Sequence, residues 1–176
     1  MSRGLGDVYK RQDCSGYVGW VMYNFFEDKN GAGSDYVTNA KNQGKLFAEM
    51  GLGKHSKEFS GVRPGDIMTS NAHVYIVIGE CTDGSILFVH SSPPGVQICG
   101  TPAKSGLYCS CAVELAKKYT QKCFPKWYKK FSNCRRGMSY LTDFSRFRWY
   151  PEIMPDTDEL YLKTPGEILE IILRKG

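Results

Sequence analysis

The chain has 176 residues, of which 41% are hydrophobic and 13% aromatic, and it carries a formal net charge of +5. This composition excludes a disordered chain, and the length fits one domain with a hydrophobic core but not two. The sequence contains no apolar run of about eighteen residues and therefore predicts no transmembrane helix.

The first twelve residues, Met1 to Gln12, resemble the translated sequencing adapter that recurs at the ends of metagenomic gene fragments. An ordinary basic N-terminal tail is the alternative. On the first interpretation this segment is not native, and it is excluded from the fold prediction. We then expect the native N-terminus, with any export signal, to be missing from the sequence.

The stretch Asp13-Cys14-Ser15-Gly16 stands just ahead of an apolar and aromatic segment. That segment predicts a buried helix that ends between Glu27 and Asn30, with Cys14 in its first turn. The first N–H groups of a helix stabilise an anion, so we expect a lowered pKa and a nucleophilic thiolate at Cys14. The alternative is a small buried hydrophobic residue. A catalytic cysteine would also need a base.

Downstream, a second and less apolar helix is expected from Asp35 to Met50, and His55 falls in a polar loop where we expect it to be exposed. The pattern then changes to β-branched and aromatic runs separated by turn residues, which predicts an antiparallel meander. The first expected strand begins at Ile67. The following strands are expected to cover residues 73–79, 86–90 and 96–98.

Two histidines lie at strand ends of this meander. His73 is the first residue of one expected strand, and His90 is the last residue of the next. In a hairpin the start of the first strand lies beside the end of the second, so we expect the two side chains to be neighbours. A histidine beside a thiolate can act as its base, and a second polar group can fix its tautomer. Taken singly, each histidine is better explained as structural. Together with the cysteine stretch, the pair favours a catalytic site.

Four blocks of the sequence carry a family resemblance. They are Asp13-Cys14-Ser15-Gly16-Tyr17-Val18, Arg63-Pro64-Gly65-Asp66-Ile67, His73-Val74-Tyr75-Ile76-Val77-Ile78-Gly79 and Phe88-Val89-His90-Ser91-Ser92. In this order and spacing they resemble the successive motifs of the NlpC/p60 family of papain-like cysteine peptidases. The resemblance implies an α+β, papain-like fold in which an N-terminal helix carrying the cysteine packs on an antiparallel β-meander. It also implies a bacterial cell-wall hydrolase that cuts peptidoglycan stem peptides, commonly next to D-glutamate or diaminopimelate, and that needs no cofactor.

The same resemblance implies roles for five residues. Cys14 matches the family nucleophile, His73 the general base, and His90 the third polar residue that orients the base. Asp13 and Ser15 match positions that help to bind the free amino end of the stem peptide. The family usually has a tyrosine-bearing, glycine-rich segment shortly before the cysteine. Here the adapter-like residues stand in its place, and Tyr9 is not a convincing substitute.

The resemblance divides the chain into an adapter-like segment (1–12), a catalytic core (13–100) and a C-terminal helical extension packed on the core (101–176). The extension is expected to contain a helix from Cys111 to Phe131, broken or kinked near Phe124-Pro125, and a last helix from Thr164 to Leu173. The mixture of aromatic and arginine residues between Met138 and Trp149 is interpreted as structural.

Basic residues are concentrated between positions 104 and 148, with eleven Lys and Arg against two acids. This segment forms either the solvated face of a helix or a surface for an anionic cell-wall polymer. The resemblance implies a peptidoglycan stem peptide as partner, and the basic segment adds an anionic cell-wall polymer as a second candidate; nucleic acid is not expected. We expect a monomer located in the bacterial cell wall or outside the cell.

The seven cysteines are an odd number, which suggests one special thiol beside six others. In an exported protein up to three disulfides are expected among Cys81, Cys99, Cys109, Cys111, Cys123 and Cys134. Reduced, scattered cysteines are the alternative. A zinc site is disfavoured because the spacings lack the paired two-residue gaps of ordinary zinc ligands.

These features together predict a cysteine endopeptidase that hydrolyses stem peptides through a thioester, with no metal or cofactor. One alternative is an amidase or acyltransferase with the same Cys-His-His set. The other is a non-catalytic module that binds the cell wall or a polyanion through the basic segment.

Overall fold

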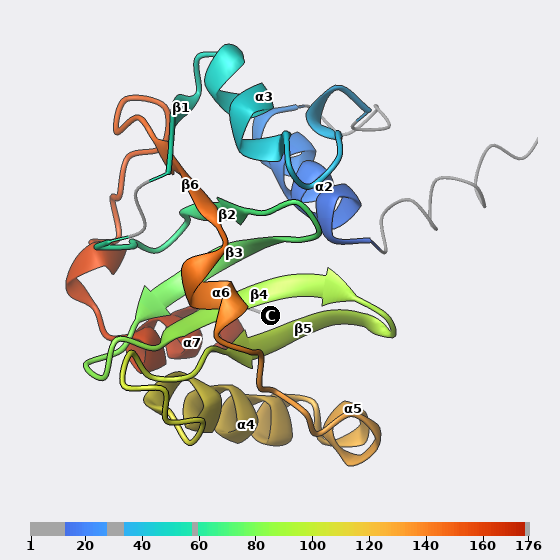
Figure 1. Ribbon diagram of the computed structural model, residues 1–176, viewed down its shortest axis with the longest axis vertical. Helices are drawn as coiled ribbons and strands as arrows, with labels where there is room; N and C mark the ends of the chain where they lie inside the picture. Colours follow the sequence, from blue (N-terminus) through green and yellow to red (C-terminus); the bar gives the residue numbers. More distant parts are fainter. Residues whose placement is uncertain (1–12, 28–33, 58–59, 175–176) are drawn as a thin grey trace, which may run out of the picture.

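A computed structural model of the chain describes residues 13–27, 34–57 and 60–174 (Figure 1). The adapter-like segment and Tyr9 lie outside these residues. In chain order the elements are α2 (Cys14–Phe26), the 3-10 helix η1 (Ser34–Tyr36), α3 (Gln43–Glu49), β1 (Gly53–Ser56), β2 (Ile67–Thr69), β3 (Val74–Glu80), β4 (Ile86–Ser92), β5 (Gly95–Gly100), α4 (Cys111–Cys123), α5 (Pro125–Lys130), α6 (Ser139–Thr142), β6 (Ser145–Trp149), η2 (Leu160–Leu162) and α7 (Pro165–Arg174).

The strands form one six-stranded antiparallel sheet in the order β1-β6-β2-β3-β4-β5. Strands β2 to β5 follow one another as the predicted meander, and α2 packs against its β3 and β4 strands. The expected α+β class and antiparallel sheet are therefore confirmed. Strand β6 returns from the C-terminal part of the chain and inserts between β1 and β2.

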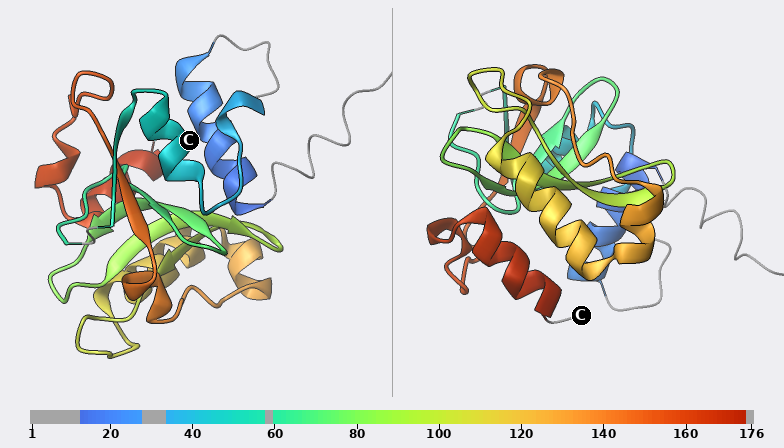
Figure 2. Two further views of the ribbon diagram at one scale, coloured as in Figure 1. Left: turned by 45° about the horizontal axis from the view of Figure 1, so that its top comes forward. Right: turned by 90° about the horizontal axis from the view of Figure 1, so that it is seen from below.

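Alternating side chains of the meander build separate cores on the two faces of the sheet. Tyr75 and Val77 join Phe88 in a cluster that the α6 segment closes. Ile78 and Leu87 join a second cluster under α4 and α7, and a third one anchors α2 and α3. In Figure 1, α6 accordingly lies in front of the sheet and α7 behind it, and the right view of Figure 2 shows α4 and α7 side by side.

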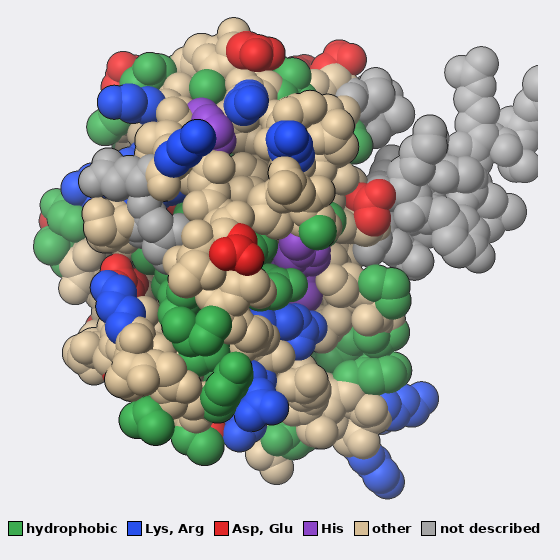
Figure 3. Space-filling model, in the orientation of Figure 1, with side chains coloured by type: hydrophobic (Ala, Val, Ile, Leu, Met, Phe, Trp, Pro, Cys, Tyr) green, Lys and Arg blue, Asp and Glu red, His purple; other side chains and the backbone are tan. Residues whose placement is uncertain are grey.

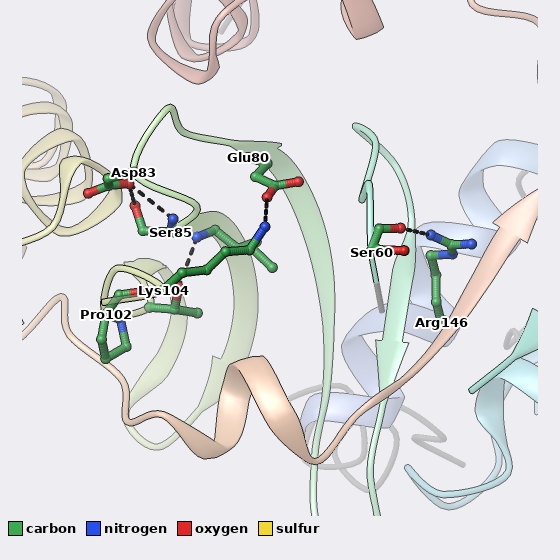
Figure 4. Close-up of polar contacts among 9 residues, drawn as sticks. Ser60, Glu80, Asp83, Ser85, Pro102, Lys104 and Arg146 are labelled. Carbon is green, nitrogen blue, oxygen red and sulfur yellow. Dashed lines mark hydrogen bonds and ion pairs between the residues drawn. The ribbon is translucent and has the colours of Figure 1, made fainter. Parts of the chain in front are cut away.

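The β3–β4 hairpin also organises the start of α4. The Asp83 carboxylate accepts hydrogen bonds from the backbone N–H (3.0 Å) and hydroxyl (2.5 Å) of Ser85 within the turn (Figure 4). Its other oxygen accepts the N–H of Cys111 at 2.8 Å, while Ser85 Oγ accepts the N–H of Ala112 at 3.0 Å. Two of the N–H groups that a helix start leaves unpaired are thus satisfied by a distant turn, which fixes α4 on the sheet.

The aspartate of the Arg63-Pro64-Gly65-Asp66 stretch has a structural partner on the inserted strand. Arg148 of β6 donates from Nε to Asp66 Oδ1 at 3.0 Å and from Nη2 to Oδ2 at 2.6 Å. Asp66 is only 1% exposed. The second arginine of β6, Arg146, is buried and donates to the backbone oxygen of Ser60 at 2.6 Å (Figure 4). Ion pairing and hydrogen bonding therefore fasten β6 into the sheet.

The structure also differs from the sequence-based expectations. The helix expected from Asp35 to Met50 is wrong in extent, because only η1 and α3 form there. Between them, the buried side chain of Gln43 donates to the backbone oxygen of Tyr36 at 2.6 Å and accepts the N–H of Thr38 at 3.4 Å. These bonds stabilise a turn in place of a continuous helix.

The prediction of an exposed His55 in a loop is also wrong. His55 lies half-buried on β1, opposite Phe147 of β6, and burial lowers its pKa, with a smaller effect from Lys45. The expected C-terminal extension is not purely helical either, since it supplies β6 to the sheet. Its helices agree better with the prediction: α4 and α5 meet at Phe124-Pro125, and α7 covers the last expected helix.

No helix within the described ranges is both long enough and apolar enough to span a lipid bilayer.

Candidate active site

Cys14 begins α2, and its position is set by the residue before it. Asp13 is the N-cap: its backbone is extended, and its side chain accepts the N–H of Gly16 at 2.6 Å. This bond starts the helix at the cysteine. The Cys14 sulfur is half-buried and lies in hydrogen-bond reach of the N–H of Val74, the first residue of β3. The nucleophile candidate therefore sits directly against the strand that follows His73.

The expected lowering of the Cys14 pKa is wrong for the free protein. Burial raises the pKa of this thiol, and the negative charge of Asp13 raises it further. The N–H groups of Val74, Ser15 and Cys14 itself act in the opposite direction but do not compensate. Desolvation of a thiolate outweighs the helix N-terminus here, so Cys14 rests as a thiol.

His73 and His90 are brought together as the hairpin geometry predicts. His73 immediately precedes β3, His90 lies in β4, and Nε2 of His73 is 2.7 Å from Nδ1 of His90. The hydroxyl of Ser92 lies 3.3 Å from the same His90 nitrogen. On the face seen in Figure 3, histidine atoms are visible near the centre, with a Lys or Arg side chain beside them.

Both imidazoles are neutral at physiological pH. Burial and, to a smaller extent, the charge of Arg136 lower the pKa of His73 to about 4. Burial, Arg136 and His73 together lower the pKa of His90 to about 3, and this side chain is 0% exposed. A neutral pair 2.7 Å apart shares one hydrogen between the facing nitrogens, so the tautomers of the two rings are linked.

This linkage decides whether His73 can act as a base. If Nε2 of His73 donates to His90, then Nδ1 of His73 keeps a lone pair that can accept a proton. His90 must then carry its own proton on Nε2, a buried atom that has no hydrogen-bond partner among the described residues. In the opposite tautomer His73 has no free lone pair. The base-competent state therefore leaves one buried N–H unpaired, at a cost of about 1–3 kcal/mol.

The two proposed substrate-binding residues have local roles at the helix start. Asp13 is exposed, and its capping oxygen also lies 3.4 Å from the hydroxyl of Ser15. Ser15 is buried, 9% exposed, under the first turn of α2. The structure places Asp13 at the surface beside Cys14, whereas the Ser15 hydroxyl faces its neighbour.

Sequence reasoning missed two residues that line the histidine pair, and both come from the C-terminal extension. The ring of Tyr140 lies 5.6 Å from that of His73 and 6.4 Å from that of His90. Arg136 shifts the pKa of both histidines and donates from Nη2 to Gln97 Oε1 at 3.0 Å. The basic and aromatic composition of the segment gave only a general signal. Nothing local in the sequence connects position 136 with position 90.

In comparisons with known proteins, no family model, no curated protein and no solved structure matches this chain. The function of the site must therefore be argued from its own residues.

All seven cysteines are free thiols. The pKa of Cys81 is raised to about 12 by burial and by hydrogen bonding with the Cys111 thiol. Within the parts of the chain that the structure describes, no group of three or more His, Cys, Asp or Glu side chains is arranged to hold a metal ion.

Proposed function

We propose that the protein is a cysteine endopeptidase of the NlpC/p60 type, with a papain-like arrangement, that hydrolyses peptide bonds in peptidoglycan stem peptides. The observation that carries the proposal is the contact between three elements. The first turn of α2 bears a thiol against the start of β3, and His73 at that point is held by His90 at 2.7 Å. A nucleophile, a base and a residue that orients the base are the parts that thiol acyl transfer requires.

In the proposed reaction Nδ1 of His73 removes the proton of Cys14 as the sulfur attacks the carbonyl carbon of the scissile amide. The C–S bond forms, and the C–N bond breaks when His73 returns the proton to the leaving amine. Water then attacks the thioester with His73 again as base, which releases the acid and restores the thiol. His90 acts as a positioning residue, accepting the Nε2–H of His73 throughout.

The negative charge that develops during attack has donors close by. The N–H groups of Cys14, Ser15 and Val74 all lie near the sulfur and stabilise negative charge on it. Of these donors, we expect the N–H of Cys14 to stabilise the oxyanion of the tetrahedral intermediate as well. The helix start thus supports the transition state even though burial keeps the resting thiol protonated.

The test is hydrolysis of purified peptidoglycan by the wild type and by Cys14→Ala and Cys14→Ser, with released fragments identified by mass spectrometry. We expect the wild type to release peptides with new amino and carboxyl ends, and both variants to release none. Full activity of Cys14→Ala would contradict the proposal. Products cut at the sugar–peptide amide, or acyl groups transferred to another amine, would identify the amidase or acyltransferase alternative. Wall binding without any cleavage would identify the binding module.

A further inference from the structure

Arg136 has a fixed position at the edge of the histidine pair. Its backbone N–H donates to the oxygen of Gly100 at 2.9 Å, which attaches the residue to the end of β5. Its Nη2 donates to Gln97 Oε1 at 3.0 Å, and Gln97 pairs with His90 across β4 and β5. The guanidinium is thus held by the residue directly opposite the positioning histidine.

The guanidinium has only neutral partners in the free protein. Nη1 donates to the backbone oxygens of Arg135 at 2.8 Å and of Asn133 at 3.4 Å, and Nη2 donates to a side-chain amide. Within the described ranges no carboxylate forms an ion pair with Arg136, whereas Arg148 and Arg174 each have one. Arg136 is also half-buried. A partly desolvated cation without a counter-ion is the arrangement that an anionic ligand completes.

Tyr140 connects this cation with the reacting groups. Burial raises the pKa of the Tyr140 hydroxyl, while the charge of Arg136 and a hydrogen bond from its side chain act in the opposite direction. The ring of the same tyrosine lies 5.6 Å from that of His73, and the next residue in the chain, Val74, directs its N–H at the Cys14 sulfur. Arg136, Tyr140, His73 and Cys14 therefore border one small region in which the scissile bond of the proposed reaction would lie.

We propose that Arg136 is a specificity-determining residue that binds a carboxylate on the peptide residue next to the scissile bond. This inference rests on the proposed function and names its substrate class: peptides with a free carboxylate at that position, as opposed to the carboxamide form. Arginine suits this role because its planar fork matches a carboxylate with two N–H donors.

Binding of a carboxylate also changes the chemistry of the site. Arg136 disfavours a positive charge on His73 in the free protein. A substrate anion that neutralises Arg136 removes this opposition, so His73 accepts the proton of Cys14 more readily in the complex. The carboxylate is therefore expected to raise kcat as well as to lower KM.

The experiment compares two synthetic stem peptides that differ only at the α-carboxyl group of glutamate, free in one and a carboxamide in the other. The wild type should cleave the carboxylate peptide with a kcat/KM about ten- to a hundredfold higher, as expected for one charge-assisted pair. Arg136→Gln should lose most of this preference, and Arg136→Lys should retain part of it. The matched control is Arg135→Gln, since Arg135 is exposed and stacks on Tyr108 at 4.8 Å; it should keep the preference.

Binding to the Cys14→Ala protein, measured by calorimetry, separates this inference from the proposed function. Tighter binding of the carboxylate peptide to Cys14→Ala than to the Cys14→Ala, Arg136→Gln double variant supports Arg136 even if the wild type cleaves neither peptide. Cleavage of both peptides at equal rates overturns the role of Arg136 and leaves the peptidase proposal standing. Equal or undetectable binding of the two peptides without cleavage overturns both.

Discussion

A single short hydrogen bond, 2.7 Å between two neutral imidazoles, governs the proposed base. Because the rings share one hydrogen, the protonation of a buried His90 atom determines whether Nδ1 of His73 has a lone pair that can accept a proton. The cost of burying that N–H, about 1–3 kcal/mol, offsets part of the rate gain of general base catalysis, which is about a hundred- to ten-thousandfold. His90 therefore matters through one atom, Nδ1, and this can be tested by replacing the ring while keeping an acceptor there.

Asparagine retains a short polar side chain that can bond Nε2 of His73, whereas leucine fills the space without an acceptor. We expect His90→Leu to lower kcat/KM for a cleaved stem peptide by about a hundredfold or more, and His90→Asn to retain most of the activity. Both constants should be measured across pH 5 to 9 with liquid chromatography, because loss of orientation lowers kcat over the whole profile. Equal losses in the two variants would mean that the ring volume, and not the hydrogen bond, is what matters.

The lowered histidine pKa values also predict how stability depends on pH. In the unfolded chain a histidine titrates near 6.5, but in the folded protein His73 titrates at about 4 and His90 at about 3. Between these values the unfolded state binds more protons, so the free energy of unfolding should fall as the pH is lowered from 7 to 5. Urea denaturation at several pH values measures this slope.

The control for the pH dependence of stability is a substitution of His55, because burial lowers the pKa of this histidine as well. We expect His90→Asn to flatten the pH dependence more than His55→Gln does, because His90 is the more deeply buried of the two. A wild-type protein with equal stability at pH 7 and pH 5 would contradict the neutral, buried histidine pair.

At the scale of elements, one buried ion pair adds to the backbone pairing that holds β6 beside β2. Asp66 and Arg148 have side-chain exposures of 2% and 27%, whereas the Lys104–Glu80 pair is 66% and 25% exposed. Removing one partner of a buried pair costs about 3–5 kcal/mol, and an exposed pair contributes about 0–1 kcal/mol. Asp66→Asn should therefore destabilise the protein toward the buried-pair figure in chemical denaturation, and Lys104→Gln should change stability little. Similar effects of the two substitutions would show that Asp66 does not anchor β6.

The sequence predicts those parts of the fold that depend on neighbouring residues. The turn at Asp83-Gly84 sets the β3–β4 register beside it. An irregularity between Val77 and Gly79, which the sequence pattern does not predict, then shifts the pairing by one residue, and the shifted register puts His73 and His90 on the same face of the sheet. The start of α2 follows from its local N-cap, Asp13. Strand β6 could not be predicted, because its two arginines point to partners more than eighty positions away, Ser60 and Asp66.

The same distinction between local and long-range determinants applies to the residues of the candidate site. Cys14 and the histidines stand in local motifs and are found from the sequence, whereas Arg136 and Tyr140 reach the site through the tertiary fold. The direction of the Cys14 pKa is a further example. A helix start predicts a lowered value, but the burial that reverses it is a property of the whole packed structure.

At the scale of the whole molecule, the division into a core and an appended extension does not describe the sheet. Strand β1 pairs with β6 alone, and Phe147 of β6 packs at the centre of the cluster that holds α2 and α3. A fragment of residues 13–100 would lose this strand together with α4, α6 and α7. We expect that fragment to be unfolded, with poor amide dispersion in a two-dimensional NMR spectrum. A well-dispersed spectrum would show that the first hundred residues fold independently.

The insertion of β6 also has a consequence for the newly made chain. Cys14, His73 and His90 leave the ribosome early, but the strand that fills the gap between β1 and β2 leaves only when Trp149 has been synthesised. Long-range pairing of this kind is slow, since loop closure must precede the contacts that reward it. The three candidate site residues therefore precede in the chain the strand that completes the sheet.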